Sequence, residues 1–558
     1  MKVKKKSLPL IILSTIFIVF AAAILLNIKW FGQRYSMIIG AAGMYNFAYE
    51  DRINSKNIDV LSYDMNIKLY PAEKYIEGEV CIHMVINNKT QENISLDFYD
   101  NMEILDFTVN QKKAEYNRTG NKLIIHADES FGDSVKVQVS YKGKPESHGF
   151  GSFEFSDDDS SQIIYTLNEP VYASTWFPCN DYPDDKVNAK ITIENDSQFV
   201  SVSNGALKNI SGNGNRKSYT WQTEYPISTF LISIYSAPYK NFTQHYITEN
   251  GDTTLLDYYV TAEKLNDAKR DFADHTMYLE VFTRLFGEYP FKNEKYAVAE
   301  IGWTGGAIEH QTITGIGSNF ISGHKFYSDI LIHELAHQWW GNAVGIKTWA
   351  DIWLSEGFST YSEALYYESV SGFDALKSTM LSNYDEFEST ELYAPDEFIF
   401  SKIVYDKGAW VLHMLRKEIG DKLFFETLRN YYDTYKYKNA STKDFQNLVE
   451  LTSGKDLQYF FDQWVYNGKG IIEVEFDWIH NSAKAQLSLQ LLQKQKGWKK
   501  YSFPIDVKLK YPYNDRDLTF SINSIDTTLI IDSEEKPDTI VFDSDAWLLA
   551  KYLRKGKN

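Results

Sequence analysis

The sequence predicts a multidomain protein of the α+β class, with strands near both ends of the chain and helices between them. A chain of 558 residues is too long for one ordinary hydrophobic core, so two to four domains are expected. Its 44% hydrophobic and 24% charged residues are typical of a folded globular protein. Apolar residues alternate with polar ones in the outer parts and recur at helical spacing in the middle, which predicts this order of elements.

Residues 1–35 predict a cytoplasmic tail and a membrane anchor. Four lysines among the first six residues precede an uncharged apolar run of 19 residues at positions 8–26. A membrane-spanning helix needs about 20 apolar residues, whereas the apolar core of a signal peptide has about 7–15. Because lysines stay in the cytoplasm, a single-pass protein of the cell membrane is expected, with everything after the anchor outside the cytoplasm. The alternative is a signal peptide cleaved after Ala21-Ala22-Ala23 and a secreted protein.

Residues 50–245 predict an N-terminal β domain. The segment from Val135 to Tyr141 alternates apolar and polar residues, as expected of a strand with one buried face. Turn-forming segments such as Ser211-Gly212-Asn213-Gly214 separate similar runs.

Residues 246–470 predict a mainly helical domain. The positions 268–286 have helical periodicity and are followed by Gly287, and the positions 328–340 are followed by Gly341. Ser441 is placed to cap a third helix.

Residues 471–558 predict a small C-terminal β-sandwich, because alternation returns there. Two sets of apolar residues each share one face of a predicted strand: Leu487, Leu489 and Leu491, and Ile505, Val507 and Leu509. The chain has no Pro/Gly-rich linkers, so its domains are expected to pack against each other.

The composition limits the partners and the kinds of cross-link. A formal net charge of -18 argues against nucleic acid as a partner. The only cysteines, Cys81 and Cys179, are compatible with one disulfide or with two free thiols, and they lack the spacing of a metal site. Nothing in the sequence indicates an oligomeric state.

A metal-binding pattern occurs inside the helix predicted at 328–340. His333 and His337 are four residues apart and therefore share one face of that helix, with Glu334 beside them. Two histidines, a third protein ligand and an open position for water make up a zinc hydrolase site. The HExxH pattern alone also arises by chance on a solvated helix, so a third ligand is needed.

Glu356 is the predicted third ligand. It follows His337 after eighteen intervening residues and begins another helical stretch, so a second helix can bring its carboxylate to the two histidines. Glu363 lies two turns further on the same face, where it can hydrogen-bond a ligand imidazole.

The segment HELAHQWWGN at 333–342, followed by Glu356 at this spacing, resembles the aminopeptidase N family of gluzincin metallopeptidases. Three further segments are similar to motifs of that family. They are Gly305-Gly306-Ala307-Ile308-Glu309-His310 (its GxMEN motif), Thr166 to Pro170 with Trp176 to Asp181 (its TQxEP and FPCxD segments), and Val404-Tyr405-Asp406-Lys407-Gly408 (the stretch with its catalytic tyrosine).

The resemblance implies a saddle-like β domain, a thermolysin-like catalytic domain, one Zn²⁺ per chain, and peptide substrates with a free N-terminus. Glu334 is then expected to act as the general base, and Tyr405 to stabilise the tetrahedral intermediate. Glu309 and Glu169 would bind the substrate's ammonium group. Gly305, Gly306 and Ala307 would let the substrate backbone approach closely.

Three positions differ from the family's motifs. Ile308 and His310 replace its Met and Asn and are expected to alter the wall of the first substrate pocket, and Ser174 replaces its Arg. Two other functions stay open on sequence alone: an epoxide hydrolase or endopeptidase on the same scaffold, and a non-catalytic membrane-bound peptide-binding protein. The intact Glu334 and three ligands favour an enzyme.

Overall fold

The computed structural model describes residues 57–87, 93–126, 132, 134–157, 162–248, 251–395 and 398–556. The membrane anchor predicted within residues 1–35 lies outside these ranges. Within them, no helix is both long enough and apolar enough to cross a bilayer. Cys81 and Cys179 are both free thiols, so the possible disulfide is not formed.

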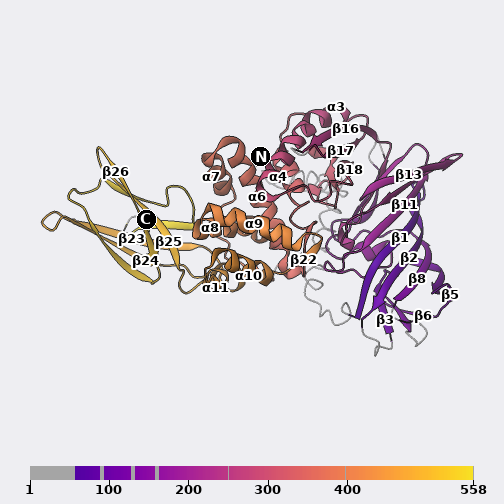
Figure 1. Ribbon diagram of the computed structural model, residues 1–558, viewed down its shortest axis with the longest axis horizontal. Helices are drawn as coiled ribbons and strands as arrows, with labels where there is room; N and C mark the ends of the chain where they lie inside the picture. Colours follow the sequence, from indigo (N-terminus) through magenta and orange to yellow (C-terminus); the bar gives the residue numbers. More distant parts are fainter. Residues whose placement is uncertain are drawn as a thin grey trace, which may run out of the picture.

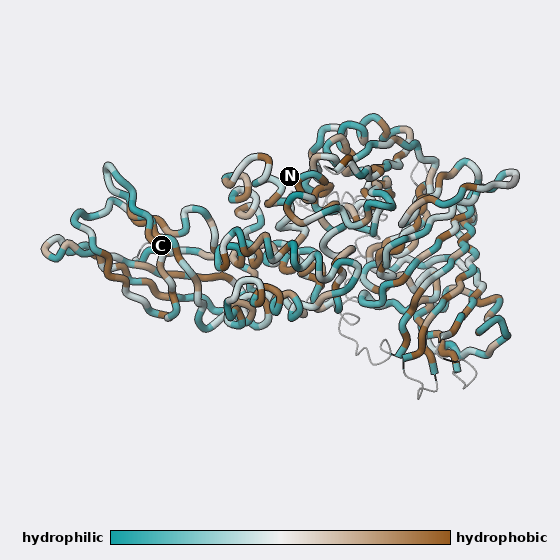
Figure 2. Tube along the Cα trace, viewed as in Figure 1, coloured by the Kyte–Doolittle hydropathy of each residue, from teal (hydrophilic) through white to brown (hydrophobic). Residues whose placement is uncertain are grey.

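The chain forms a multidomain protein with a β-rich N-terminal part, a helical middle and a β-sheet C-terminal part, which follow one another along its longest axis (Figure 1). Apolar residues lie along the strands and between the helices, whereas hydrophilic residues predominate on the outer turns of the helices (Figure 2). This distribution is expected when each part buries its own apolar face.

The described residues of the N-terminal part form three sheets. The largest has eight strands in the order β13-β14-β11-β1-β2-β8-β4-β5, and two smaller ones have the orders β12-β15-β10-β9 and β3-β7-β6. The bounds are β1 Ile58–Tyr70, β2 Tyr75–Ile86, β3 Asn93–Asp97, β4 Met102–Val109, β5 Lys112–Lys113, β6 Tyr116–Thr119, β7 Lys122–His126, β8 Ser134–Gly143, β9 Ser152–Asp157, β10 Gln162–Leu167, β11 Asn188–Asp196, β12 Val200–Ser203, β13 Ala206–Asn213, β14 Arg216–Gln222 and β15 Ile234–Ala237. The predicted alternation in β8 is confirmed, since Val135, Val137, Val139 and Tyr141 are all buried.

The middle part combines a five-stranded sheet, in the order β16-β17-β18-β20-β19, with a group of helices. Its strands are β16 Lys240–Ile247, β17 Thr253–Val260, β18 Tyr296–Ile301, β19 Ala307–Ile308 and β20 Ile313–Gly317, with a separate pair β21 Val344–Ile346 and β22 Lys438–Ala440. Its helices are α3 Leu265–Asp271, α4 His275–Phe286, α5 Ser328–Ala336, α6 Trp353–Ser371, α7 Phe373–Ser382, α8 Gly408–Ile419, α9 Asp421–Tyr435, α10 Thr442–Ser453 and α11 Gln458–Phe461, and two π-helical turns cover Ile403–Lys407 and Asp462–Tyr466.

The predicted helix ends are largely confirmed. Gly287 ends α4 with a positive φ of 113°, and Ser441 caps α10 through a capping box with Asp444. The stretch 268–286 is interrupted by a short 3₁₀ turn between α3 and α4. Helix α5 ends at Ala336 rather than at 340, because the N–H groups of Gln338 and Trp339 donate three residues back and tighten the chain into turns before Gly341.

Two small sheets form the C-terminal part, with the orders β27-β24-β23-β29 and β26-β25-β28. Their bounds are β23 Ile472–Asn481, β24 Gln486–Gln493, β25 Phe503–Lys510, β26 Asp515–Ile522, β27 Asp526–Asp532, β28 Thr539–Phe542 and β29 Ala550–Arg554. Both predicted apolar faces are buried. Phe476 of the first sheet contacts Phe542 of the second, with ring centroids 4.6 Å apart, so the two sheets pack face to face.

Candidate metal centre

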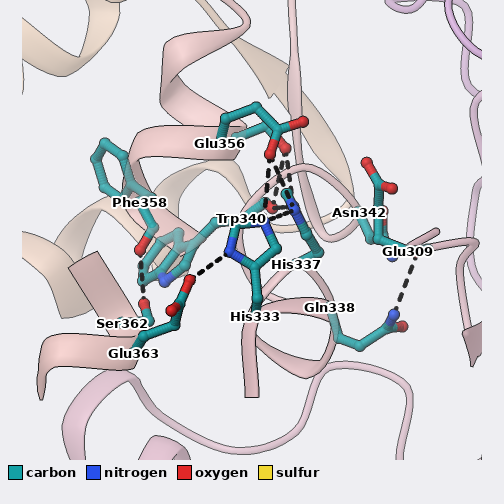
Figure 3. Close-up of polar contacts among 11 residues, drawn as sticks. Glu309, His333, His337, Gln338, Trp340, Asn342, Glu356, Phe358, Ser362 and Glu363 are labelled. Carbon is teal, nitrogen blue, oxygen red and sulfur yellow. Dashed lines mark hydrogen bonds and ion pairs between the residues drawn. The ribbon is translucent and has the colours of Figure 1, made fainter. Parts of the chain in front are cut away.

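Helices α5 and α6 bring the three predicted ligands together (Figure 3). The Nε2 atoms of His333 and His337 are 3.0 Å apart. They lie 3.4 Å and 3.3 Å from Oε2 of Glu356. His337 keeps helical backbone angles at the cap of α5, so both imidazoles project from one face as the four-residue spacing predicts.

These separations fit a tetrahedral ion. Zinc ligands at about 2.0–2.1 Å from the metal lie roughly 3.3 Å from one another, so one cation can contact all three atoms and keep a fourth position open. Two nitrogen lone pairs and a carboxylate that face each other this closely repel unless a cation lies between them. Two imidazoles and one carboxylate form the ligand set of a catalytic zinc site.

The other nitrogen of each imidazole is held by the protein. Nδ1 of His333 lies 2.7 Å from Oε1 of Glu363, as the sequence predicts for that carboxylate. Nδ1 of His337 donates to the Trp340 carbonyl at 3.0 Å and lies 3.1 Å from Oγ of Ser355. Because both Nδ1 atoms carry the proton, both Nε2 atoms direct a lone pair at the metal position.

A cavity of about 540 Å³ opens over these ligands. All of the predicted site residues line it: Glu169, Gly305, Gly306, Ala307, Glu309, His333, Glu334, His337, Glu356, Glu363 and Tyr405. They come from a strand end of the N-terminal part, an edge strand, two helices and a π-helical turn, so the site depends on the packing of the first two parts of the chain.

Carboxylates dominate the inner end of the cavity. Oxygen atoms of Glu169, Glu309 and Glu356 lie within 4.8 Å of one another. One oxygen of Glu169 and one of Glu334 are buried without a hydrogen-bond partner. Among the described residues, no lysine or arginine pairs with Glu169, Glu309 or Glu334.

The protein environment holds these groups at different charge states. Burial and the negative charge of Glu309 raise the pKa of Glu169 well above its ordinary value, and they raise the pKa of Glu334 to about 8. Burial alone would also raise the pKa of Glu356, but the positive charge and hydrogen bonds of His337 and His333 in their protonated forms outweigh it and lower that pKa to about 2. A metal ion at the ligands and a cationic substrate group would supply the positive charge that the unpaired Glu169 and Glu334 lack.

The position of Glu309 is fixed from the turn after helix α5. Nδ2 of Asn342 donates to the Glu309 carbonyl at 2.6 Å, and Nε2 of Gln338 donates to the same carbonyl at 3.3 Å (Figure 3). Gln338 also accepts from the N–H of Thr312 at 2.8 Å. The sequence did not reveal the roles of these two amides. Gln338 and Asn342 lie one and five residues after His337, and their hydrogen bonds connect the turn after α5 to Glu309, the residue that follows β19.

Tyr405 lies on a π-helical turn that packs closely against α6. Its ring centroid is 6.0 Å from that of His333. A Cβ added to Gly357 would lie 2.8 Å from Cα of Gly408 and 3.1 Å from the Val404 carbonyl, so only glycine permits this approach. The glycine pair, which the sequence did not reveal, brings Tyr405 to the ligand-bearing helix.

The Gly305-Gly306-Ala307 segment forms one wall of the cavity and leads into β19, the edge strand of its sheet. Gly306 has a φ of 148°, which favours glycine. A Cβ on Gly305 would lie 2.5 Å from the ring of Trp303. The backbone of this segment therefore lines the cavity without bulky side chains of its own, which leaves room for the expected close approach of a substrate backbone.

The three residues that differ from the family's motifs lie in different surroundings. Ile308 lines the cavity. His310 does not: it is fully buried, and its Nδ1 contacts the hydroxyl of Tyr235, so its side chain forms no part of the cavity wall. Ser174 donates to Asp181 through its N–H at 3.0 Å and its hydroxyl at 2.8 Å.

Comparison with family models gives two matches that together cover more than half of the chain. Residues 60–231 match the peptidase M1 N-terminal domain, and residues 276–464 match the peptidase family M1 domain. The second range contains the three ligands, and the first contains Glu169.

Similar curated proteins include probable aminopeptidase 2 of Sulfurisphaera tokodaii, which is 23% identical over 75% of this chain and 55% of its own length. Another is the mitochondrial aminopeptidase 2 of Saccharomyces cerevisiae, which is 26% identical over 75% of this chain and 47% of its own length. The chain thus spans about half the length of the curated relatives it matches.

Two solved structures are similar in fold. Legionella pneumophila aminopeptidase A, in complex with aspartic acid, has a TM-score of 0.79 at 18% identity, covering 91% of this chain and 60% of its own. The M1 zinc metallopeptidase of Deinococcus radiodurans has a TM-score of 0.66 at 24% identity, covering 74% of this chain and 94% of its own.

Proposed function

This chain belongs to the peptidase M1 family, and from that premise we propose that it is a zinc-dependent aminopeptidase, which removes N-terminal residues from peptides. Curated relatives carry aminopeptidase names, and a structural neighbour is described as an M1 zinc metallopeptidase. The observation that carries the proposal is the group of buried carboxylates beside the three ligand atoms, where Glu169 and Glu309 have no lysine or arginine partner among the described residues.

Nε2 of His333, Nε2 of His337 and Oε2 of Glu356 would hold one Zn²⁺ per chain. When bound, zinc makes a water more acidic and polarises the scissile carbonyl. The three-ligand arrangement supports this assignment because it keeps a position open for reactants.

Glu334 acts as the general base and then the general acid. Its buried carboxylate, 6% exposed, lines the cavity next to both imidazoles, and one oxygen has no protein partner. It accepts a proton from the attacking water and donates it to the leaving amine. Burial and nearby carboxylates, first among them Glu356, raise the pKa of Tyr405, so its phenol stays protonated and donates to the developing oxyanion.

Glu309 and Glu169 bind the substrate's ammonium group, which explains why two acidic side chains are buried there without a cation. The Gly305-Gly306-Ala307 backbone aligns the peptide beside the edge strand. A substrate without a free amine leaves both carboxylates unpaired, which is costly in a buried site.

The test compares one dipeptide amide in free and N-acetylated form. Loss of a charge-assisted contact predicts that the acetylated form is cleaved about 100-fold more slowly, or worse. Glu309→Ala should erase most of this preference and keep zinc, whereas Glu280→Ala, an exposed residue of α4, should change neither. Equal rates on both forms would indicate an endopeptidase, and no hydrolysis by zinc-loaded protein would indicate a peptide-binding protein.

We also propose a membrane location. Residues 1–35 are a cytoplasmic tail and a single transmembrane anchor, followed by an N-terminal β domain (50–245), a thermolysin-like catalytic domain (246–470) and a β-sandwich (471–558). The apolar run behind four lysines supports the anchor and its orientation. Protease added to intact cells should digest the catalytic domain, and protection until the membrane is opened would refute this orientation.

A further inference from the structure

Four aromatic side chains form one continuous wall of the cavity: Phe150, Trp303, Phe398 and Phe400. The ring centroid of Phe150 lies 5.7 Å from Trp303, 6.3 Å from Phe398 and 5.3 Å from Phe400. Phe398 and Phe400 are themselves 5.7 Å apart. We call this group the aromatic wall. It joins the N-terminal part of the chain to the helical part across the cavity.

The aromatic wall begins beside the residues proposed to bind the ammonium group. Strands β9 and β10 pair antiparallel, and their ladder ends with Ser152 opposite Leu167. Phe150 lies two residues before Ser152, Glu169 lies two residues after Leu167, and both line the cavity. The Trp303 ring lies against Gly305, at the start of the segment that carries Glu309. The wall therefore includes residues that neighbour both carboxylates along the chain and share their cavity.

The wall residues are only partly buried, in contrast to the fully buried tryptophans of the core. Phe400 is backed by Trp349, with ring centroids 6.2 Å apart, and Trp349 is itself buried. The rings thus have a fixed support on one side and leave apolar surface toward the cavity. An apolar group that covers this surface gains free energy in proportion to the area removed from water.

The wall itself consists of uncharged rings. Among the described residues, the one lysine that lines the cavity, Lys402, is largely exposed and already pairs with Asp385 at 3.7 Å. An acidic side chain placed against the rings would lose hydration, and such an exposed, paired lysine would offset little of that cost. An aromatic or branched apolar side chain does not pay this desolvation cost.

We propose that the aromatic wall selects substrates whose N-terminal residue has a large apolar side chain, with phenylalanine and leucine preferred over alanine and glutamate. This inference rests on the proposed aminopeptidase function, because the ammonium group fixes which substrate side chain contacts the wall. Phe150 and Phe400 are its specificity-determining residues: they contact the side chain and take no part in the reaction.

The experiment uses aminoacyl-coumarins of Phe, Leu, Ala and Glu with the zinc-loaded full chain. From the area that a large apolar side chain buries, kcat/KM for Phe should exceed that for Ala by about 10- to 100-fold. Phe150→Ala and Phe400→Ala should each lower kcat/KM for Phe far more than for Ala. Phe326→Ala is the matched control, since that side chain is 72% exposed and does not line the cavity.

Similar kcat/KM values for Phe and Ala, or equal losses on both substrates in the two variants, would overturn the inference. A second measurement separates it from the proposed function. Calorimetric titration of the Glu334→Gln protein with phenylalanine amide and alanine amide reports binding without turnover. Tighter binding of phenylalanine amide that Phe150→Ala abolishes supports the wall even if no substrate is cleaved, and equal binding of the two amides contradicts it even if both substrates are cleaved.

Discussion

The two ends of the cavity are built in different ways. At the polar end, His333, His337 and Glu356 come from two adjacent helices within one short stretch of chain, and their atoms meet at 3.0–3.4 Å. At the aromatic end, Phe150, Trp303 and Phe400 come from three distant segments, and their rings meet at 5.3–5.7 Å. Charges at short range require accurate placement, whereas apolar contact is non-directional and roughly proportional to area.

From this difference we expect some substitutions to stop hydrolysis of every substrate and others to change which substrate is hydrolysed fastest. A substitution at the polar end should affect every substrate alike, because all substrates share the same reacting groups. A substitution at the aromatic end should alter the ranking of substrates.

The largest effect is expected from a lost ligand. His337→Ala should remove zinc and, with it, hydrolysis of every substrate, because two remaining ligands cannot offset the dehydration of the ion. Elemental analysis measures the zinc content directly. His324→Ala, in an exposed loop, is the control and should keep full zinc. Full zinc in the His337→Ala protein would refute the ligand assignment.

Glu334→Gln should have the next largest effect. The amide cannot accept the water's proton, so kcat should fall at least about 100-fold on phenylalanine and alanine substrates alike, while zinc content and melting temperature stay unchanged. Steady-state rates on both substrates check this expectation. A loss of activity confined to one substrate would contradict the expectation that the polar end affects all substrates alike.

A smaller effect is expected from the support of the ligands. Glu363→Gln weakens the acceptor that holds Nδ1 of His333, and zinc affinity should fall about 10- to 100-fold, with activity restored by added zinc. Competition with a zinc chelator measures the affinity. The matched control is Glu426→Gln, an exposed residue of α9. Unchanged zinc affinity in Glu363→Gln would mean that the hydrogen bond does not support the ligand.

The sequence predicted the polar end of the site because helical periodicity converts spacing into geometry. The four-residue spacing of His333 and His337 places both rings on one face, and their Nε2 atoms lie 3.0 Å apart. The order of strands and helices and the buried faces of β8, β24 and β25 followed from periodicity in the same way.

The rest of the site depends on tertiary packing that spacing does not encode. Phe150 reaches the cavity from the end of β9, which pairs with β10, and Phe400 lines the same cavity from the segment before the π-helical turn. A single glutamine, asparagine or glycine in a sequence likewise gives little indication of its structural role. The roles of Gln338, Asn342, Gly357 and Gly408 become visible only when their neighbours are in place.

The most direct test of the central claim is the product pattern from a peptide such as Phe-Ala-Ala-Tyr, followed by mass spectrometry. We expect free phenylalanine and the peptide shortened by one residue to appear first, a zinc chelator to stop the reaction, and added zinc to restore it. Internal fragments before any free phenylalanine, or an intact peptide after incubation with fully zinc-loaded protein, would contradict the assignment of this chain as a zinc aminopeptidase.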